Sequence, residues 1–226
     1  MARLARVVVA GYPYHVTQRG NRRADVFFSA EDRDVYRKWL RQYATKLELD
    51  VWAYCLMTNH VHLLVVPPRA DSLARVIGQT HMRYARWVNW EQGWSGHLWA
   101  NRFYSTPLDE THLWAAVKYV ECNPVRVGLV ARAEDYRWSS ARAHALGLAD
   151  PLLSPSRPFP DAARVPDWSA WLAEGLDEES LARLRTHTAT GRPCGSESFV
   201  GLLERILGRL LKPQKVGRKP KDGRNE

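Results

Sequence analysis

Cysteine is scarce in this sequence, and long hydrophobic runs are missing. The three cysteines, Cys55, Cys122 and Cys194, lie far apart and form no C-x-x-C pair, which argues against a zinc ribbon and favours reduced thiols. No apolar run approaches the roughly 20 residues that cross a bilayer. The first residues also lack the small-residue cleavage site of a signal peptide. We therefore expect a cytoplasmic protein without a membrane partner.

Acidic residues are outnumbered by basic ones. The chain of 226 residues holds 33 Lys and Arg against 24 Asp and Glu, a formal net charge of +9. Such a chain is attracted to polyanions through phosphate contacts and counterion release. Ten tryptophans and nine tyrosines add aromatic faces that can stack on unpaired bases, although most of these rings belong in a core. The composition favours a nucleic-acid partner, and a basic protein without such a partner is the plainer alternative.

Hydrophobic periodicity predicts a β-α-β-β-α-β order followed by a third helix. Strands are expected at 7–17, 49–57, 60–66 and 97–105, and helices at 29–47, 73–88 and 109–122. Ser29 and Asp32 resemble a capping box at the start of the first helix. This order is that of the ferredoxin-like (RRM-like) α+β fold, an antiparallel sheet with helices on one face. We predict that fold, with a helical extension at the C-terminal end.

The remaining segments suggest a division of the chain. A short helix within 136–147 completes a first domain over residues 1–149, and five prolines mark 150–168 as a linker. Residues 169–211 form the helical extension, with one helix expected over 167–184 and an amphipathic helix after the turn at "TGRP". The tail, 212–226, carries six Lys and Arg against two acids. Such a tail is most often disordered and loosely attached to nucleic acid.

The stretch "TNHVHLLVVPP" places two histidines at the start of a predicted buried strand. Side chains alternate along a strand, so His60 and His62 share a face with Leu64 and Val66. A single buried histidine is usually a hydrogen-bonded core residue. Two on one face can also bind a divalent metal as neutral imidazoles and leave positions open for a substrate phosphate.

The predicted helix "DETHLWAAVKYVECNPVRVGLV" carries a second group of candidates. His112, Tyr119 and Asn123 lie on one arc, since helical residues seven and four positions apart nearly eclipse. Pro124 is expected to end the helix near Asn123. A tyrosine beside an apolar stripe is ordinarily a core residue with its hydroxyl at the rim. Asn123, one turn on, can reach the same point in space, whereas Glu121 points away by helical phase.

These motifs together resemble the single-strand-specific HUH tyrosine transposases, which carry His-hydrophobe-His on a central strand and a catalytic tyrosine on a helix beside it. His60-Val61-His62 matches the first motif, and "YVECNPVRVGLV" is similar to the Y-x-x-x-N-P-x-R-x-G signature of the REP-associated tyrosine transposases, or RAYT proteins. "YHVTQRGNRRADVFF", "GHLWANRFYSTPLD" and the stretch after "TGRP" resemble further segments of that group, so the resemblance covers most of residues 1–221. Val127 stands where the group usually has alanine.

The resemblance implies an enzyme that nicks and rejoins single-stranded DNA. Tyr119 would attack a DNA phosphate, form a 5′-phosphotyrosine link and release a 3′-hydroxyl. His60 and His62, with Asn123 as the candidate third ligand, would hold Mg²⁺ or Mn²⁺ at that phosphate. The substrate would be an imperfect palindromic hairpin of the REP type with an adjoining single strand. Rejoining would need no ATP, and no G-x-x-x-x-G-K-[ST] loop is present.

Candidate DNA contacts gather around the basic loop "QRGNRR" and the fourth predicted strand, with one more in the later turn: Arg19, Asn21, Arg22, Arg23, Arg102, Tyr104 and Arg192. For any one arginine, a solvated turn is an equal alternative. The competing function is a domesticated, non-catalytic protein that binds structured DNA or RNA. A third possibility is a metal hydrolase that uses water, but the sequence lacks the clustered carboxylates of a two-metal site. Monomer and homodimer both stay open, and a nucleoid-associated location is expected.

Overall fold

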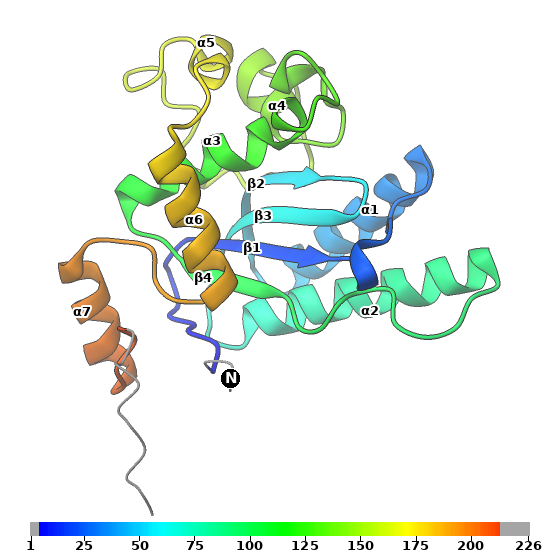
Figure 1. Ribbon diagram of the computed structural model, residues 1–226, viewed down its shortest axis with the longest axis horizontal. Helices are drawn as coiled ribbons and strands as arrows, with labels where there is room; N and C mark the ends of the chain where they lie inside the picture. Colours follow the sequence, from blue (N-terminus) through cyan, green and yellow to red (C-terminus); the bar gives the residue numbers. More distant parts are fainter. Residues whose placement is uncertain (1–4, 213–226) are drawn as a thin grey trace, which may run out of the picture.

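Strand β3 lies inside a four-stranded antiparallel sheet in the computed structural model of Figure 1, which describes residues 5–212. The strand order is β2-β3-β1-β4, and every neighbouring pair is antiparallel. The strands are β1 (Tyr14–Arg19), β2 (Asp50–Leu56), β3 (His60–Val66) and β4 (Tyr104–Pro107). The predicted α+β ferredoxin-like sheet is confirmed, and its two central strands are β3 and β1.

One face of the sheet is covered by α1 (Ala30–Lys46) and α2 (Ser72–Gln92), as Figure 1 shows. The odd-numbered residues of β3, including Leu63 and Val65, are fully buried here against Tyr36 of α1 and Ile77 of α2. The capping box predicted before α1 is present, since the Ser29 and Asp32 side chains each accept a hydrogen bond from the other residue's backbone. This face forms the larger apolar core.

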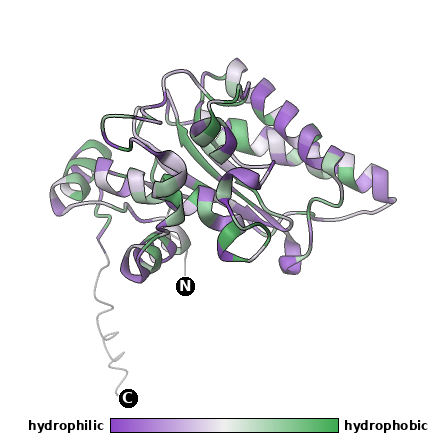
Figure 2. Ribbon diagram, turned by 90° about the horizontal axis from the view of Figure 1, so that it is seen from above, coloured by the Kyte–Doolittle hydropathy of each residue, from purple (hydrophilic) through white to green (hydrophobic). Residues whose placement is uncertain are grey.

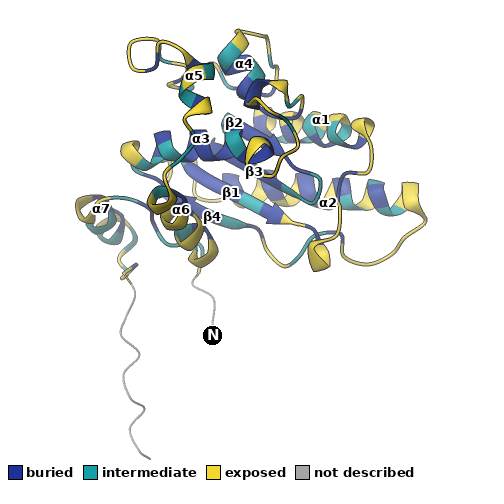
Figure 3. Cartoon of the chain, turned by 45° about the horizontal axis from the view of Figure 1, so that its top comes forward, coloured by how far each residue is buried: buried dark blue, intermediate teal, exposed yellow. Residues whose placement is uncertain are grey.

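The other face of the sheet is covered as well. Helix α3 (Glu110–Arg126) lies on β2 and β3, and α6 (Glu178–Thr190) crosses β1 and β4 (Figure 1). Leu64 and Cys55 are fully buried on this side against Val117 and Val120 of α3. Figure 2 shows the hydrophobic strands between helices with hydrophilic outer faces, and Figure 3 shows the strands as buried. Helices thus cover both faces, because α3 and, from the C-terminal extension, α6 form the second layer.

Helix α3 runs through Pro124 to Arg126, so the expected end at Asn123 is wrong. Proline has no N–H to give to the carbonyl four residues back, which here belongs to Val120. The amide of Asn123 takes over part of that role, since its Nδ2 donates to the carbonyl of Tyr119 at 2.8 Å and lies 3.5 Å from that of Val120. The helix therefore continues for a further turn, which carries Arg126.

The first predicted strand begins later than expected. Only Tyr14–Arg19 pairs, although the sequence is apolar from Val7 onward. Val7 and Val9 are buried instead against Phe199 and Leu203 of α7 (Glu197–Leu207). A tertiary contact with the far end of the chain satisfies this apolar stretch, and no strand is needed to bury it.

Two further boundaries differ from the prediction. Strand β4 begins at Tyr104 rather than at residue 97, because Trp99 packs on His81 with ring centroids 4.4 Å apart and donates its indole N–H to that residue's carbonyl. The helix expected over 167–184 is two helices, α5 (Trp168–Ala173) and α6, separated at Gly175, whose φ is 69°. The short helices η1 (Asn21–Arg23), η2 (Ala133–Asp135) and α4 (Ala141–Leu146) complete the elements.

The proline-rich segment 150–168 packs against the core along much of its length. Phe159 is 2% exposed and lies against Trp168 and Trp114. Ser154 exchanges hydrogen bonds with the backbone of Val51 on β2. The division of the chain into domains stays a prediction, and the basic tail beyond Lys212 lies outside the described residues. Across residues 5–212, no helix combines the length and the apolar character that a membrane crossing requires.

Candidate active site

Three histidines share the sheet face that α3 and α6 cover. In the β1–β3 register, Thr17 stands opposite His62 and Arg19 opposite His60, so the odd-numbered residues of β1 lie on the histidine face. His15 is therefore a diagonal neighbour of His62, and its Nε2 lies 2.9 Å from Nδ1 of His62. Their rings stack with centroids 5.1 Å apart, and the His60 ring stands 4.8 Å from that of His62.

Tyr119 enters this cluster from α3. Its ring meets those of His15 and His62 edge-on, with centroid distances of 5.6 and 5.4 Å. The guanidinium carbon of Arg126 lies 5.1 Å from the centroid of the Tyr119 ring. Tyr119 keeps 8% of its surface exposed. The structure thus brings together a tyrosine, the two predicted histidines of β3 and a guanidinium group on one face of the sheet, over its central strands.

Burial keeps the three imidazoles uncharged. Desolvation, with help from Arg19 and Arg126, lowers the pKa of His60 to about 4. Desolvation likewise lowers the pKa of His15 to about 4, and it holds the pKa of His62 well below 6.5. Each ring is therefore neutral near pH 7, the state in which an imidazole nitrogen can bind a metal.

Two imidazole nitrogens at the site, Nε2 of His60 and Nε2 of His62, can act as metal ligands. Nδ1 of His60 lies 2.6 Å from Oδ1 of Asn59, and Nδ1 of His62 is engaged by His15. The Nε2 atoms of His60 and His62 have no hydrogen-bond partner within residues 5–212. The pair fits two ligands of a divalent cation, yet no three His, Cys, Asp or Glu side chains in the described part of the chain gather closely enough to hold one.

The candidate third ligand, Asn123, is engaged inside its own helix. Its Nδ2 donates to the carbonyl of Tyr119, and its Oδ1 accepts a hydrogen bond from Arg126. The residue is fully buried. Arg126 thus occupies one of the two lone pairs of the Asn123 oxygen. His112, on the same predicted arc, pairs instead with Asp109 at 2.6 Å.

The basic loop folds directly against the start of β3. The Gly20 N–H donates to the carbonyl of Asn59 at 2.8 Å, and Nδ2 of Asn59 donates to the carbonyl of Arg23 at 3.0 Å. Gly20 is required here, because a Cβ would lie 2.2 Å from the carbonyl oxygen of Ala24. The four candidate contacts of this loop, Arg19, Asn21, Arg22 and Arg23, are exposed. They border the histidine cluster at the His60 end.

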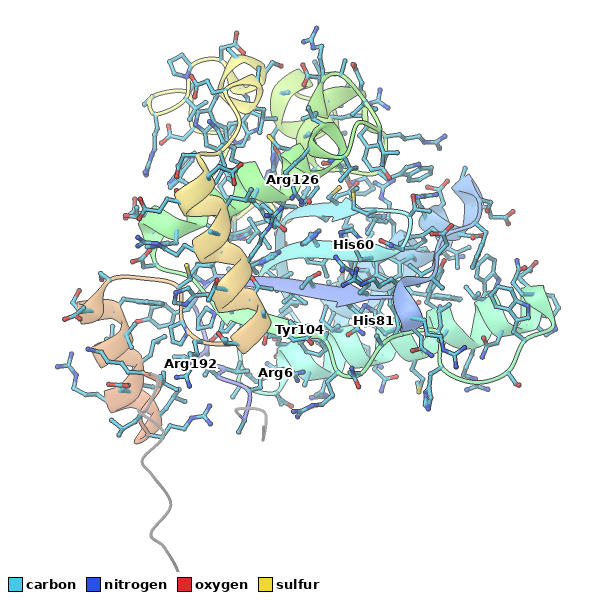
Figure 4. All side chains as sticks on the ribbon, viewed as in Figure 1. Arg6, His60, His81, Tyr104, Arg126 and Arg192 are labelled. Carbon is cyan, nitrogen blue, oxygen red and sulfur yellow. The ribbon has the colours of Figure 1, made fainter. Side chains whose placement is uncertain are left out.

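The other candidate contacts divide into two groups. Tyr104 pairs with Thr17 on β1, and exposed Arg102 precedes it in the segment that bridges to the loop through Gly20 and Trp99. Arg192 lies elsewhere, since its guanidinium donates to the carbonyl of Leu211 beyond α7. Figure 4 shows it beside α7, apart from His60 and Arg126. The structure thus gathers every proposed DNA contact except Arg192.

The sequence prediction left out two residues of the cluster, His15 and Arg126. Arg126 stands seven residues after Tyr119, which places both on the same side of an unbroken helix. Because the helix was expected to end before Pro124, the sequence did not place Arg126 on the same side of the helix as Tyr119. His15 could be found only from the pairing of β1 with β3, a contact between segments 47 residues apart.

A cavity of about 670 Å³ opens beside Tyr119. It lies between the end of α3, η2 and the helices α5 and α6, and Arg126, Arg132, Leu172 and Leu181 contribute to its wall. Its walls are largely apolar, and beside the guanidinium groups they carry Glu134, Asp167 and Glu178, with Arg132 paired to Glu134.

Comparisons with known proteins give a family match and a similarity of fold. The family model described as "Transposase IS200 like" matches residues 8–123, just over half of the chain. The fold is similar to the solved structure of a REP-associated tyrosine transposase bound to a REP hairpin, with a TM-score of 0.56, 17% identity, and coverage of 70% of this chain and 94% of that one. A Deinococcus radiodurans protein described as a transposase aligns with a TM-score of 0.38 and 22% identity over 53% of this chain and 96% of that one. No curated protein matches the sequence.

Proposed function

The chain belongs to the IS200-like transposase family, and from this membership we propose that it cleaves and rejoins single-stranded DNA through Tyr119. Membership agrees with the family that the sequence motifs indicated and implies a DNA-cleaving and rejoining enzyme in general. The residues, the metal and the substrate are our proposal. The observation that carries it is the edge-on packing of Tyr119 against His62, with 5.4 Å between ring centroids, beside two Nε2 atoms that have no hydrogen-bond partner among residues 5–212.

Tyr119 is the nucleophile in this proposal. Its phenolic oxygen bonds to a DNA phosphorus, and the bond from that phosphorus to the 3′-oxygen breaks. The phenol gives up its proton, the 3′-oxygen takes one, and a 5′-phosphotyrosine link and a 3′-hydroxyl result. Because one phosphodiester replaces another, the reverse attack by a 3′-hydroxyl rejoins the strand without ATP. Arg126 places a fixed positive charge beside the ring, where it would stabilise the phosphate.

The proposal includes a divalent cation at the same site. His60 and His62 would hold Mg²⁺ or Mn²⁺, with Asn123 as the third protein ligand once Arg126 turns from its oxygen to the substrate phosphate. When bound, the cation would supply Lewis acidity to the scissile phosphate. The protein's own part is to keep both imidazoles neutral and oriented, and the burial of His62 also shields that ring from water.

The proposed substrate is an imperfect palindromic hairpin with an adjoining single strand. The similar solved structure is that of a tyrosine transposase bound to a REP hairpin, and the motifs here resemble that group. Exposed Arg19, Arg22 and Arg23 would contact phosphates beside the cluster. The cavity beside Tyr119 would receive a base next to the scissile phosphate. Contacts of this kind weaken as salt rises.

A denaturing gel tests the proposal. End-labelled hairpins with single-stranded flanks, taken from repeats around the gene, are incubated with the protein and Mg²⁺ or Mn²⁺. We expect a labelled covalent adduct with the wild type and with Tyr12→Phe, a matched control, because Tyr12 lies outside the cluster. Tyr119→Phe and the His60→Ala/His62→Ala pair should give no adduct. Tight hairpin binding without cleavage by the wild type would favour the non-catalytic binder instead.

A further inference from the structure

A chain of hydrogen bonds leads from the C-terminal extension to the proposed metal ligand His62. Oγ1 of Thr188, on α6, lies 2.9 Å from Nδ1 of His15, and Nε2 of His15 lies 2.9 Å from Nδ1 of His62. We infer that His15 and Thr188 are positioning residues that fix the tautomer of His62, so that its Nε2 lone pair faces the cation. The inference rests on the proposed function, in which His62 binds a metal.

The two hydrogen bonds that link Thr188, His15 and His62 can be donated in either of two directions. In one, His62 donates from Nδ1 to His15, His15 donates from its own Nδ1 to Thr188, and Nε2 of His62 keeps a lone pair. In the other, Thr188 donates to His15, His15 donates to His62, and Nε2 of His62 carries the hydrogen. Only the first direction leaves a nitrogen that can bind a metal, since a neutral imidazole has one donor and one acceptor nitrogen.

The direction of these hydrogen bonds matters because His15, His62 and Thr188 are buried. His15 is 1% exposed and His62 4% exposed, so solvent has little access to replace either hydrogen bond. Thr188 is 7% exposed, and its hydroxyl makes no other hydrogen bond within the described residues. The last turn of α6 is held on the sheet, because Oγ1 of Thr106 on β4 donates to the carbonyl of His187 at 3.0 Å. The hydroxyl of Thr188 is thus held beside Nδ1 of His15.

Thr188 lies well outside residues 8–123, the part of the chain that the family model matches. The extension therefore completes the site with a residue that no motif of the matched segment supplies. His60 is held separately, because its Nδ1 can donate to Asn59, whose amide is anchored on the backbone of Arg23. The two imidazoles have independent supports, and only that of His62 depends on α6.

Removal of the Thr188 hydroxyl should move the hydrogens on His15 and His62. In Thr188→Val, Nδ1 of His15 loses its acceptor, and a buried N–H without a partner is rarer than a buried acceptor without one. His15 should then place its hydrogen on Nε2 and donate to His62, which forces the hydrogen of His62 onto Nε2. Loss of such a supporting hydrogen bond typically lowers metal affinity about 10–100-fold.

Two readouts on the full-length protein test this inference. Long-range ¹H–¹⁵N spectra of ¹⁵N-histidine protein without added metal report which nitrogen of His62 carries the hydrogen. Titration with Mn²⁺, followed by the paramagnetic resonance of the free ion, reports affinity. Thr188→Ser restores the hydroxyl and should behave as the wild type. Thr190→Val is the matched control, because Thr190 is exposed on the same helix and its hydroxyl bonds only to carbonyls of that helix.

We expect a hydrogen on Nδ1 of His62 in the wild type, Thr188→Ser and Thr190→Val, and on Nε2 in Thr188→Val. The Mn²⁺ affinity of Thr188→Val should fall about 10–100-fold. A wild-type His62 with its hydrogen on Nε2, or equal affinity in the wild type and Thr188→Val, would overturn the inference. If Thr188→Val does not fold, the wild-type tautomer alone decides. Absence of DNA cleavage with the expected tautomer and affinity would count against the proposed function and leave this inference standing.

Discussion

Glu121 offers the sharpest test of how the second layer of helices is held on the sheet. Its carboxylate is fully buried and accepts hydrogen bonds from Nδ1 of His144 at 2.7 Å, from the indole N–H of Trp168 at 2.8 Å and from the hydroxyl of Ser140. One side chain of α3 thereby ties α4 and α5 to the core. Replacing it by leucine keeps a similar volume and removes every acceptor.

The expected loss of folding stability follows from the hydrogen-bond donors that Glu121→Leu leaves without an acceptor. The hydroxyl of Ser140 retains the carbonyl of Tyr54 at 3.3 Å, so two N–H donors, on His144 and Trp168, remain without a partner. A buried unsatisfied donor costs about 1–3 kcal/mol, which gives about 2–6 kcal/mol for Glu121→Leu. That is a large part of the roughly 5–15 kcal/mol that stabilises an ordinary domain.

Urea denaturation followed by far-ultraviolet circular dichroism measures this loss. The matched control is Glu179→Leu, the same substitution at an exposed carboxylate that pairs with Arg183 at 2.8 Å. An exposed pair contributes about 1 kcal/mol or less, so the control should stay within that range. If Glu121→Leu lowers the free energy of unfolding by no more than Glu179→Leu does, the buried carboxylate does not hold these helices.

Two further predictions concern the site. Arg126→Ala should slow single-turnover cleavage of the hairpin about 10²–10³-fold, the usual effect of removing a charge-stabilising donor, while a gel-shift assay shows hairpin binding retained; an unchanged rate would exclude Arg126 from the chemistry. The free energy of unfolding should fall as pH drops from about 6.5 to about 4, because in this window the unfolded chain binds protons that His15 and His60, with pKa values lowered to about 4, do not bind in the fold. Urea titrations at several pH values should show a shallower fall for His60→Asn, and a fall no shallower than that of the wild type would contradict the lowered pKa of His60.

The parts of the fold that the sequence predicted are those with local signals. Residues 60–66 form β3 with the expected bounds, because the turn at Thr58 and Asn59 and the two prolines at its end delimit an apolar run. Helical spacing likewise placed Tyr119 on the arc beside the apolar stripe of α3, where the structure shows it buried. Both signals lie within about ten residues of the elements that they define, so no knowledge of the tertiary contacts was needed.

The parts that the sequence did not predict depend on distant contacts. His15 joins the cluster through strand register, and Thr188 reaches His15 across 173 residues of chain. The end of α3 was missed because Pro124 is a strong local signal that the amide of Asn123 compensates. In each case a tertiary or side-chain contact, and not the local sequence pattern, decided the outcome.

The contact between the two ends of the described chain has a consequence for biosynthesis. Arg209 donates to the carbonyls of Ala5 and Arg6, and Val7 and Val9 are buried against α7. Synthesis proceeds from the N-terminal side, so this apolar stretch stays uncovered until α7 has emerged from the ribosome. Thr188 also arrives late. A nascent chain therefore cannot complete the hydrogen bonds of the histidine cluster before α6 has left the ribosome.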